Sequence, residues 1–327
     1  WQGNSIYDSL NMPKARFNNG EEFIFALLIT GILIVPAYYL LKPLYMHVQG
    51  LQFLWYYIPL FLISMAGLWL YNELQFKKLP ALWNKNSFIR NLSPFELLYI
   101  KNKEIRPAIH ACVNLMLEEN KIMSKGEYLL ANVPGAKPNN AAQMAIADVL
   151  NTNTETSYHD LFKALIDKPV FTNTATFYKQ LEIYMSESQF VTNVCRVNYL
   201  VMSALTILCT TRLITGIQNS KPVGFLIVTM LISCVVFFVA ISHLYALPTK
   251  SLLNYYEEEV IPAHPEAQSF SWQFYLLGYV VFNSSFVSMY QNVEQHYRSL
   301  SSDSGSSDSG SGCGGGGCGG GCGGCGG

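Results

Sequence analysis

The sequence predicts an all-α integral membrane protein with four transmembrane helices, five as the alternative, a helical winged-helix-like cytoplasmic domain and a disordered Cys/Gly tail. Three observations carry this prediction. Half of the 327 residues are apolar and 13% are charged, against about a quarter charged in soluble domains. Four apolar stretches approach the roughly 20 residues with which a helix crosses a bilayer. Fourteen of the 24 glycines follow residue 304, which sets the tail apart.

The first membrane hairpin follows an N-terminal segment, residues 1–22, and covers residues 23–71. Its two spans, residues 23–41 and 51–71, contain no acidic residue. Pro36 should kink the first span without preventing insertion. The second span is rich in aromatic residues suited to interfacial anchoring, namely Trp55, Tyr56, Tyr57, Trp69 and Tyr71.

The second hairpin covers residues 198–247, with spans at residues 199–217 and 223–247. Arg212 is the only charge inside these spans. Because it lies within a turn or two of the end of its span, we expect its side chain to extend to the lipid headgroups.

The soluble helical domain covers residues 72–197 and should be cytoplasmic, since it holds 14 of the 21 basic residues. With four spans, the N-terminus and the tail lie on that same side. The chain begins with Trp1, so we expect residues upstream. A removed signal peptide among them would favour the opposite orientation.

Two helical units are predicted within this domain. The sequence Ser93-Pro94-Phe95-Glu96 is a capping box with proline at the first helical position. A second helix is expected over residues 106–119 and a turn or hairpin over residues 121–130. A similar start recurs at Ser157, followed by a helix from about 175 to 185. Residues 94–130 and 157–195 are therefore hypothesised to be winged-helix-like repeats.

Nucleic-acid binding is not predicted, because the domain has 14 basic and 12 acidic residues, whereas phosphate binding needs a clustered basic face. An enzyme is not predicted either, since the sequence has no P-loop, dinucleotide, zinc-protease or serine-hydrolase motif. The run Glu257-Glu258-Glu259 is expected to be a solvated acidic turn. The histidines share no ligand spacing and are found at His47, His110, His159, His243, His264 and His296.

The juxtamembrane region, residues 248–298, contains a fifth apolar stretch at residues 270–290. Gln273 and Asn283 weaken it as a membrane span. We interpret it as an interfacial or partner-packed helix, with a true span as the alternative.

The C-terminal region consists of a Ser/Asp/Gly linker, residues 299–312, and the Cys/Gly tail, residues 313–327. Four thiolates separated by glycine suit Zn(II), Cu(I) or an iron–sulfur cluster, although the spacing matches no standard site. The predicted metal ligands are Cys313, Cys318, Cys322 and Cys325. Enzymatic modification of these cysteines and a spacer role are the alternatives. The other four, Cys112, Cys195, Cys209 and Cys234, are expected to be buried apolar residues.

These features resemble a group of uncharacterised bacterial membrane proteins that have a near-uncharacterised conserved domain and a Cys/Gly-rich C-terminus. The run from Ser93 to Ile100 is similar to the group's Pro-Tyr-Glu-Leu-Ala-Tyr-Leu type motif, and residues 312–327 are similar to its tails. The resemblance covers residues 85–327. Lys101-Asn102-Lys103 replaces the usual glycine pair, and two spans precede the domain where one is expected. The resemblance implies no activity, although some members are associated with enzymes that modify Cys-containing peptides.

Taken together, the sequence predicts a multi-pass, non-enzymatic protein of the bacterial inner (cytoplasmic) membrane. It would present the four-cysteine tail for metal binding, with zinc or copper as the cofactor, or for modification by a partner enzyme. The alternative is an accessory or scaffold subunit of a larger membrane complex. The expected partners are the lipid bilayer and a protein, either the modifying enzyme or the complex, with no nucleic acid.

Overall fold

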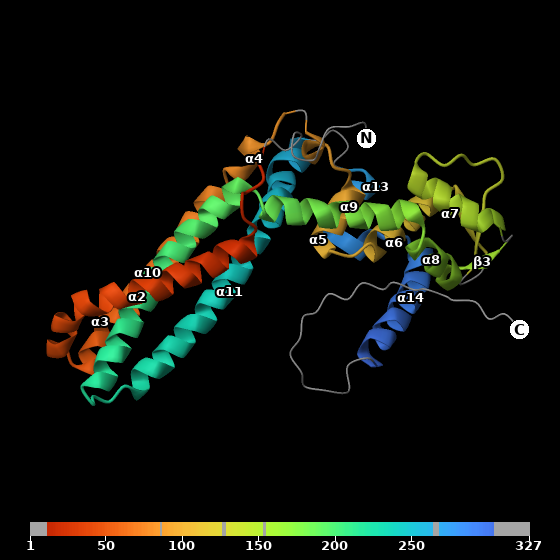
Figure 1. Cartoon of the computed structure of the whole chain (residues 1–327). Coiled ribbons are helices and arrows are strands. Elements are labelled where there is room, and N and C mark those ends of the chain that lie inside the picture. Colours follow the sequence, from red (N-terminus) through yellow and green to blue (C-terminus); the bar gives the residue numbers. More distant parts are fainter. Residues whose placement is uncertain (1–11, 86, 126–128, 153–154, 264–267, 304–327) are drawn as a thin grey trace, which may run out of the picture.

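The protein consists of a long helical bundle joined end to end with a globular domain (Figure 1). The computed structural model describes residues 12–85, 87–125, 129–152, 155–263 and 268–303. Most of these residues are helical, as predicted.

The bundle contains α2 (Asn19–His47), α3 (Gly50–Phe76), α10 (Gln189–Gln218) and α11 (Gly224–Tyr255). Within the described residues, four helices are long and apolar enough to cross a membrane, and each includes one of the bundle helices. The prediction of four helices able to span a membrane is therefore confirmed by their length and composition. The outward-facing side chains agree with this, since Trp55 is 79% exposed and Leu40 77% exposed, as lipid contact requires.

Aromatic rings fill the inside of the bundle. Phe53, Tyr57 and Phe61 lie four residues apart on α3, so they share one helix face, and successive ring centroids are 5.4 and 6.2 Å apart. Phe237 on α11 packs 5.5 Å from Phe61. The four helices thus share one apolar core, to which Tyr45 on α2 and Leu205 on α10 also belong.

Polar contacts join the bundle helices near the globular domain. The side-chain amides of Asn72 on α3 and Asn198 on α10 donate to each other's oxygens, at 3.0 and 2.8 Å. Arg196 forms an ion pair with Glu22 of α2, with Nη2 2.5 Å from Oε1. Paired side chains of this kind satisfy polar groups that lipid could not.

The globular domain is built mainly of helices, with a small three-stranded antiparallel sheet of order β1-β2-β3. Ile122 of β1 pairs with Asn132 of β2, and Leu129 of β2 pairs with Ser157 of β3. Its elements are α4 (Leu79–Leu82), α5 (Pro94–Asn102), α6 (Arg106–Glu118), β1 (Ile122–Lys125), β2 (Leu129–Asn132), α7 (Ala141–Thr152), β3 (Thr156–Ser157), α8 (Tyr158–Ile166), α9 (Pro169–Ser186), α12 (Ile261–Ala263), α13 (Phe270–Leu277) and α14 (Ser284–Asp303).

The first predicted unit of this domain is present as helix, helix and hairpin. α5 begins at the predicted capping box, in which the Glu96 backbone N–H donates to Ser93 Oγ and the Ser93 N–H donates to Glu96 Oε2. β1 and β2 form the hairpin expected over residues 121–130. The order of elements is that of a winged helix, but the winged-helix fold itself stays a prediction.

The second unit differs from the prediction. Ser157 does cap α8, since the Asp160 N–H donates to Ser157 Oγ at 3.1 Å. The next helix, α9, begins at Pro169 rather than near residue 175. It leads into α10 after only two residues, so residues 158–195 contain no strand. The hairpin expected to complete this unit is therefore absent, because the chain enters the membrane bundle instead.

The alternative prediction of a fifth membrane span at residues 270–290 is wrong. α13 has only eight residues and ends at Gly278, whose φ of 67° and ψ of −144° suit glycine alone. A 3-10 turn, Gly278–Val281, follows before α14 begins. Trp272, Phe274 and Tyr275 of α13 are buried and join the same core as α5 and α6. Residues assigned to a separate juxtamembrane region therefore complete the globular domain.

Tyr256 connects the end of α11 to the globular domain. Its hydroxyl donates to the Ile89 carbonyl at 2.8 Å and accepts from the Leu92 N–H at 2.7 Å. The expected acidic turn at residues 257–259 is instead part of a π-helix, Tyr256–Val260, that continues α11. Its three glutamates are exposed, as predicted for a solvated run.

Candidate functional site

A cluster of buried polar side chains lies where α6, α8 and α14 meet. α6 presents Arg106 and His110 on one face, because residues four apart in a helix are neighbours. Tyr158 is the first residue of α8, which Ser157 caps. Glu294 lies in the middle of α14. Three elements from distant parts of the chain therefore supply one site.

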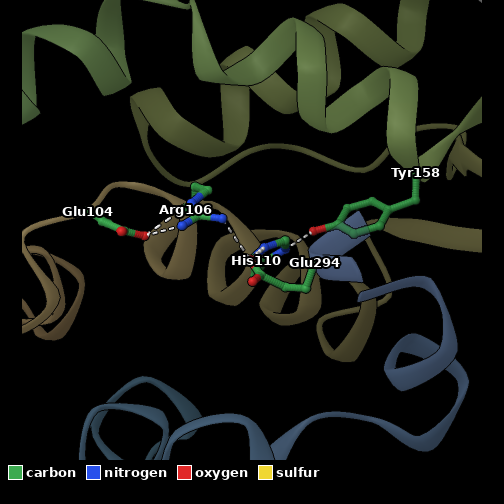
Figure 2. A network of polar contacts seen from close by, with 5 residues as sticks. All are labelled: Glu104, Arg106, His110, Tyr158 and Glu294. Atoms are coloured by element: carbon green, nitrogen blue, oxygen red, sulfur yellow. Dashed lines mark hydrogen bonds and ion pairs between the residues drawn. The ribbon is translucent and has the colours of Figure 1, made fainter. Parts of the chain in front are cut away.

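His110 is the centre of this network (Figure 2). Its Nδ1 lies 2.5 Å from Tyr158 Oη and its Nε2 lies 3.3 Å from Glu294 Oε1. Arg106 extends the chain of contacts, with Nη1 3.6 Å from Glu294 Oε1 and Nη2 2.6 Å from Glu104 Oε2. Both ring nitrogens of the histidine are thus occupied by protein groups.

Aromatic rings enclose the histidine completely, so that none of it is exposed. The Phe162 ring is stacked on the imidazole at 4.6 Å between centroids, and Tyr290 meets it edge-on at 5.1 Å. Phe286 covers Tyr158, with 4.9 Å between their ring centroids. Phe286 and Tyr290 belong to α14, so this helix provides both an acidic partner and part of the apolar enclosure.

The protonation state of His110 follows from its surroundings. Burial lowers the pKa of His110, and Arg106 lowers it further, against the opposing effect of Glu294. Burial also raises the pKa of Tyr158 well above its usual value, so the phenol keeps its proton. A neutral imidazole donates from one nitrogen and accepts at the other. Tyr158 Oη–H therefore donates to Nδ1, and Nε2–H donates to Glu294.

This arrangement suits a structural connection better than catalysis. A glutamate, a histidine and a tyrosine in series could move a proton, but no substrate atom can reach an imidazole that is fully enclosed and bonded at both nitrogens. The same contacts hold α14 against α6 and α8. Asn114 adds a further contact, since its Oδ1 accepts from the Asn283 N–H just before α14 at 3.0 Å.

Acid should weaken this connection. The pKa of His110 is lower in the folded protein than its usual value of 6.5, so the unfolded chain binds this proton more readily. The stabilisation is therefore complete above about pH 6.5 and is lost as the pH falls towards the folded-state pKa. Hydrogen exchange of α14 should be faster at about pH 5 than at about pH 7.5. In His110→Gln the extra acid sensitivity should disappear; an equal pH dependence in both proteins would contradict this assignment.

The predicted metal ligands Cys313, Cys318, Cys322 and Cys325 lie outside the described residues. In the part of the chain that the structure describes, no three His, Cys, Asp or Glu residues are placed to hold a metal. Of the other cysteines, Cys112, Cys195 and Cys209 are buried as expected, whereas Cys234 is exposed in a groove that α11 forms with α2 and α10.

Arg212 behaves differently from the prediction, and two histidines that the sequence did not connect lie close together. The Arg212 side chain is 2% exposed instead of extending freely from the end of its span, because the Val48 carbonyl at the neighbouring turn accepts from its Nη2 at 3.0 Å. His159 and His296, far apart in sequence, have ring centroids 4.6 Å apart on α8 and α14. The sequence analysis did not single out His110 from the other histidines. Its position four residues after Arg106, on the apolar face of α6, could have indicated a buried polar pair.

Comparison with protein-family models, with curated proteins and with solved structures gave no match. The resemblance carried by the Ser93 motif and the Cys/Gly tail stays a prediction.

Proposed function

We propose that this protein is a membrane-anchored, non-enzymatic platform that presents the thiols of Cys313, Cys318, Cys322 and Cys325 for metal binding or for modification by a partner enzyme. The supporting observation is the attachment of α14. This helix is the last described element, and the cysteines follow it after a short Ser/Asp/Gly stretch. Its buried side chains Phe286, Met289 and Val293 hold it against the globular domain, so the tail follows a helix whose position is fixed.

The remaining thiols are poorly suited to the same chemistry. Burial raises the pKa of Cys112 to about 12, so its thiol stays protonated and is neither a good nucleophile nor a good ligand. Cys195 and Cys209 are 1% exposed inside the bundle. Cys234 is exposed on a membrane helix, away from the globular domain. This distribution favours the tail as the place of thiol chemistry.

The topology supports a location of the cysteine tail on the same side of the membrane as the N-terminal segment and the globular domain. The Ala15 N–H donates to the Glu187 carbonyl and the Gln189 N–H donates to the Pro13 carbonyl, at 3.0 and 2.9 Å. The N-terminal segment is therefore fixed where α9 meets α10. With four spans, α14 also lies at this end of the bundle. By the distribution of Lys and Arg, we assign this end to the cytoplasm.

Mass spectrometry and metal analysis of the natively purified protein test the proposal. We expect either about one equivalent of Zn or Cu per chain or a tail peptide whose mass differs from the encoded value. Replacing the four tail cysteines together by serine should abolish whichever is found. The matched control is Cys234→Ser, which removes an exposed thiol outside the tail and should change neither result.

An unmodified tail without metal in the native protein would exclude both forms of the proposal. The protein would then be proposed as an accessory or scaffold subunit. Co-purification of a stoichiometric protein partner that stays bound after residues 304–327 are deleted would support that role.

A further inference from the structure

The end of the bundle farthest from the globular domain contains a buried arginine. Arg212 donates from Nη2 to the Val48 carbonyl, and its guanidinium carbon lies 5.9 Å from the centroid of the Tyr45 ring. Its Nε is buried and has no hydrogen-bond partner. A cation that is 2% exposed is costly in an apolar environment unless an anion accompanies it.

Among the residues that the structure describes, no carboxylate at this end supplies that negative charge. Residues 42–54 and 208–226, which form the two turns and the adjoining helix ends, contain no Asp or Glu. They contain the basic residues Lys42, Arg212 and Lys221. None of the ten ion pairs found among the described residues involves them. The local charge is therefore positive and uncompensated.

A cavity of about 370 Å³ lies beside Arg212. This volume is within the usual range for small-molecule sites, which is roughly 300–1,000 Å³. Its polar lining comes from Arg212, Lys221 and Gln49. Its apolar lining includes Leu51, Leu54 and Phe225, of which Phe225 is 76% exposed on the outer surface of α11.

The backbone places Lys221 next to the arginine. The Lys221 N–H donates to the Gly216 carbonyl at 2.9 Å, and Ser220 adopts a left-handed conformation with φ 50°. Gly216 permits this tight approach, because a Cβ there would lie 2.5 Å from Cγ1 of Val223. The ammonium of Lys221 donates to the Met46 carbonyl at 3.0 Å and keeps two further N–H groups for a ligand.

We propose that this cavity binds the phosphate of an anionic membrane lipid. The guanidinium of Arg212 and the ammonium of Lys221 would donate charge-assisted hydrogen bonds to the phosphate oxygens. The site lies at the end of the membrane helices, which is the depth of the headgroups. The apolar wall of Leu51, Leu54 and Phe225 continues from the cavity to the lipid-facing surface, where an acyl chain would lie. A free phosphate ion has no apolar part that could contact this wall.

Native mass spectrometry of the full-length protein, reconstituted with phosphatidylglycerol or with phosphatidylcholine, tests this site. The wild-type protein should retain phosphatidylglycerol preferentially. Arg212→Gln and Lys221→Gln should each reduce that retention about tenfold, as the loss of one charge-assisted hydrogen bond predicts. Lys42→Gln is the matched control, because Lys42 lies at the same end but its ammonium contacts the Tyr38 ring and does not line the cavity.

Loss of lipid binding can be distinguished from loss of folding. Lys221 is only half-buried, so Lys221→Gln should fold even where Arg212→Gln does not, and a thermal melt of each variant checks this. Retention of phosphatidylglycerol that is unchanged in both variants would overturn the proposal. Displacement of the lipid by millimolar inorganic phosphate would show that the site binds free phosphate and would contradict a lipid ligand. The site is independent of the tail, so it stands or fails separately from the proposed function.

Discussion

Replacing Phe286 by alanine should release α14 from the globular domain. Phe286 is fully buried, and its ring lies 4.9 Å from Tyr158 and 5.1 Å from Phe282 between centroids. Truncation of a buried phenylalanine costs roughly 3–5 kcal/mol. Since α14 is held by one face only, most of this cost should appear as local opening of the helix rather than as unfolding of the bundle.

Hydrogen exchange of the full-length protein in lipid nanodiscs measures this effect. Peptides from residues 284–303 should lose protection in Phe286→Ala, while peptides from α2 and α3 should not change. Val280→Ala is the control, because this nearby apolar side chain is 88% exposed and its truncation leaves no cavity. Unchanged protection of α14 in Phe286→Ala would show that another contact holds the helix.

Replacing His110 by alanine should destabilise the same region from the opposite side. The substitution leaves the Tyr158 hydroxyl buried without its acceptor, which costs roughly 1–3 kcal/mol. It also removes the ring that stacks on Phe162 and opens a cavity at a fully enclosed position, which adds to the loss. Glu294 retains Arg106, 3.6 Å away, so its charge is not left without a partner.

A double variant separates the hydrogen bond from the packing. His110→Ala combined with Tyr158→Phe should be less destabilised than the sum of the single variants, because the hydroxyl that lacks an acceptor is then absent. Denaturant unfolding monitored in the globular domain provides the free energies. Lys163→Ala, at an exposed position on the same helix α8, should change the stability by less than about 0.5 kcal/mol. A His110→Ala protein as stable as wild type would refute the role of the network.

The sequence predicted those parts of the fold whose cause is local. Apolar runs of sufficient length became the four membrane helices, and the Ser93–Glu96 capping box marks the start of α5 because both of its hydrogen bonds join residues three apart. The hairpin over 121–130 likewise depends on neighbouring residues. In each case the residues that interact lie close together in the sequence.

Features that depend on distant partners could not be predicted. Arg212 is buried because it bonds to Val48, 164 positions away, and no periodicity encodes that pairing. The contact of His110 with Glu294 spans 184 positions. The apolar stretch at 270–290 looked like a weak membrane span because burial in a globular core and burial in lipid select the same residues. Gln273, Asn283 and the break at Gly278 are what separate the two.

The core of the globular domain joins residues made before and after the second membrane hairpin, such as Leu97 and Phe286. During synthesis, α6 and α8 leave the ribosome long before α14 exists, and the faces that α14 will cover stay open to solvent meanwhile. Such surfaces are prone to aggregation and attract chaperones. The last step of folding must wait until α11 has been inserted. A closed globular domain is therefore found only on a chain whose translation and membrane insertion are both essentially finished.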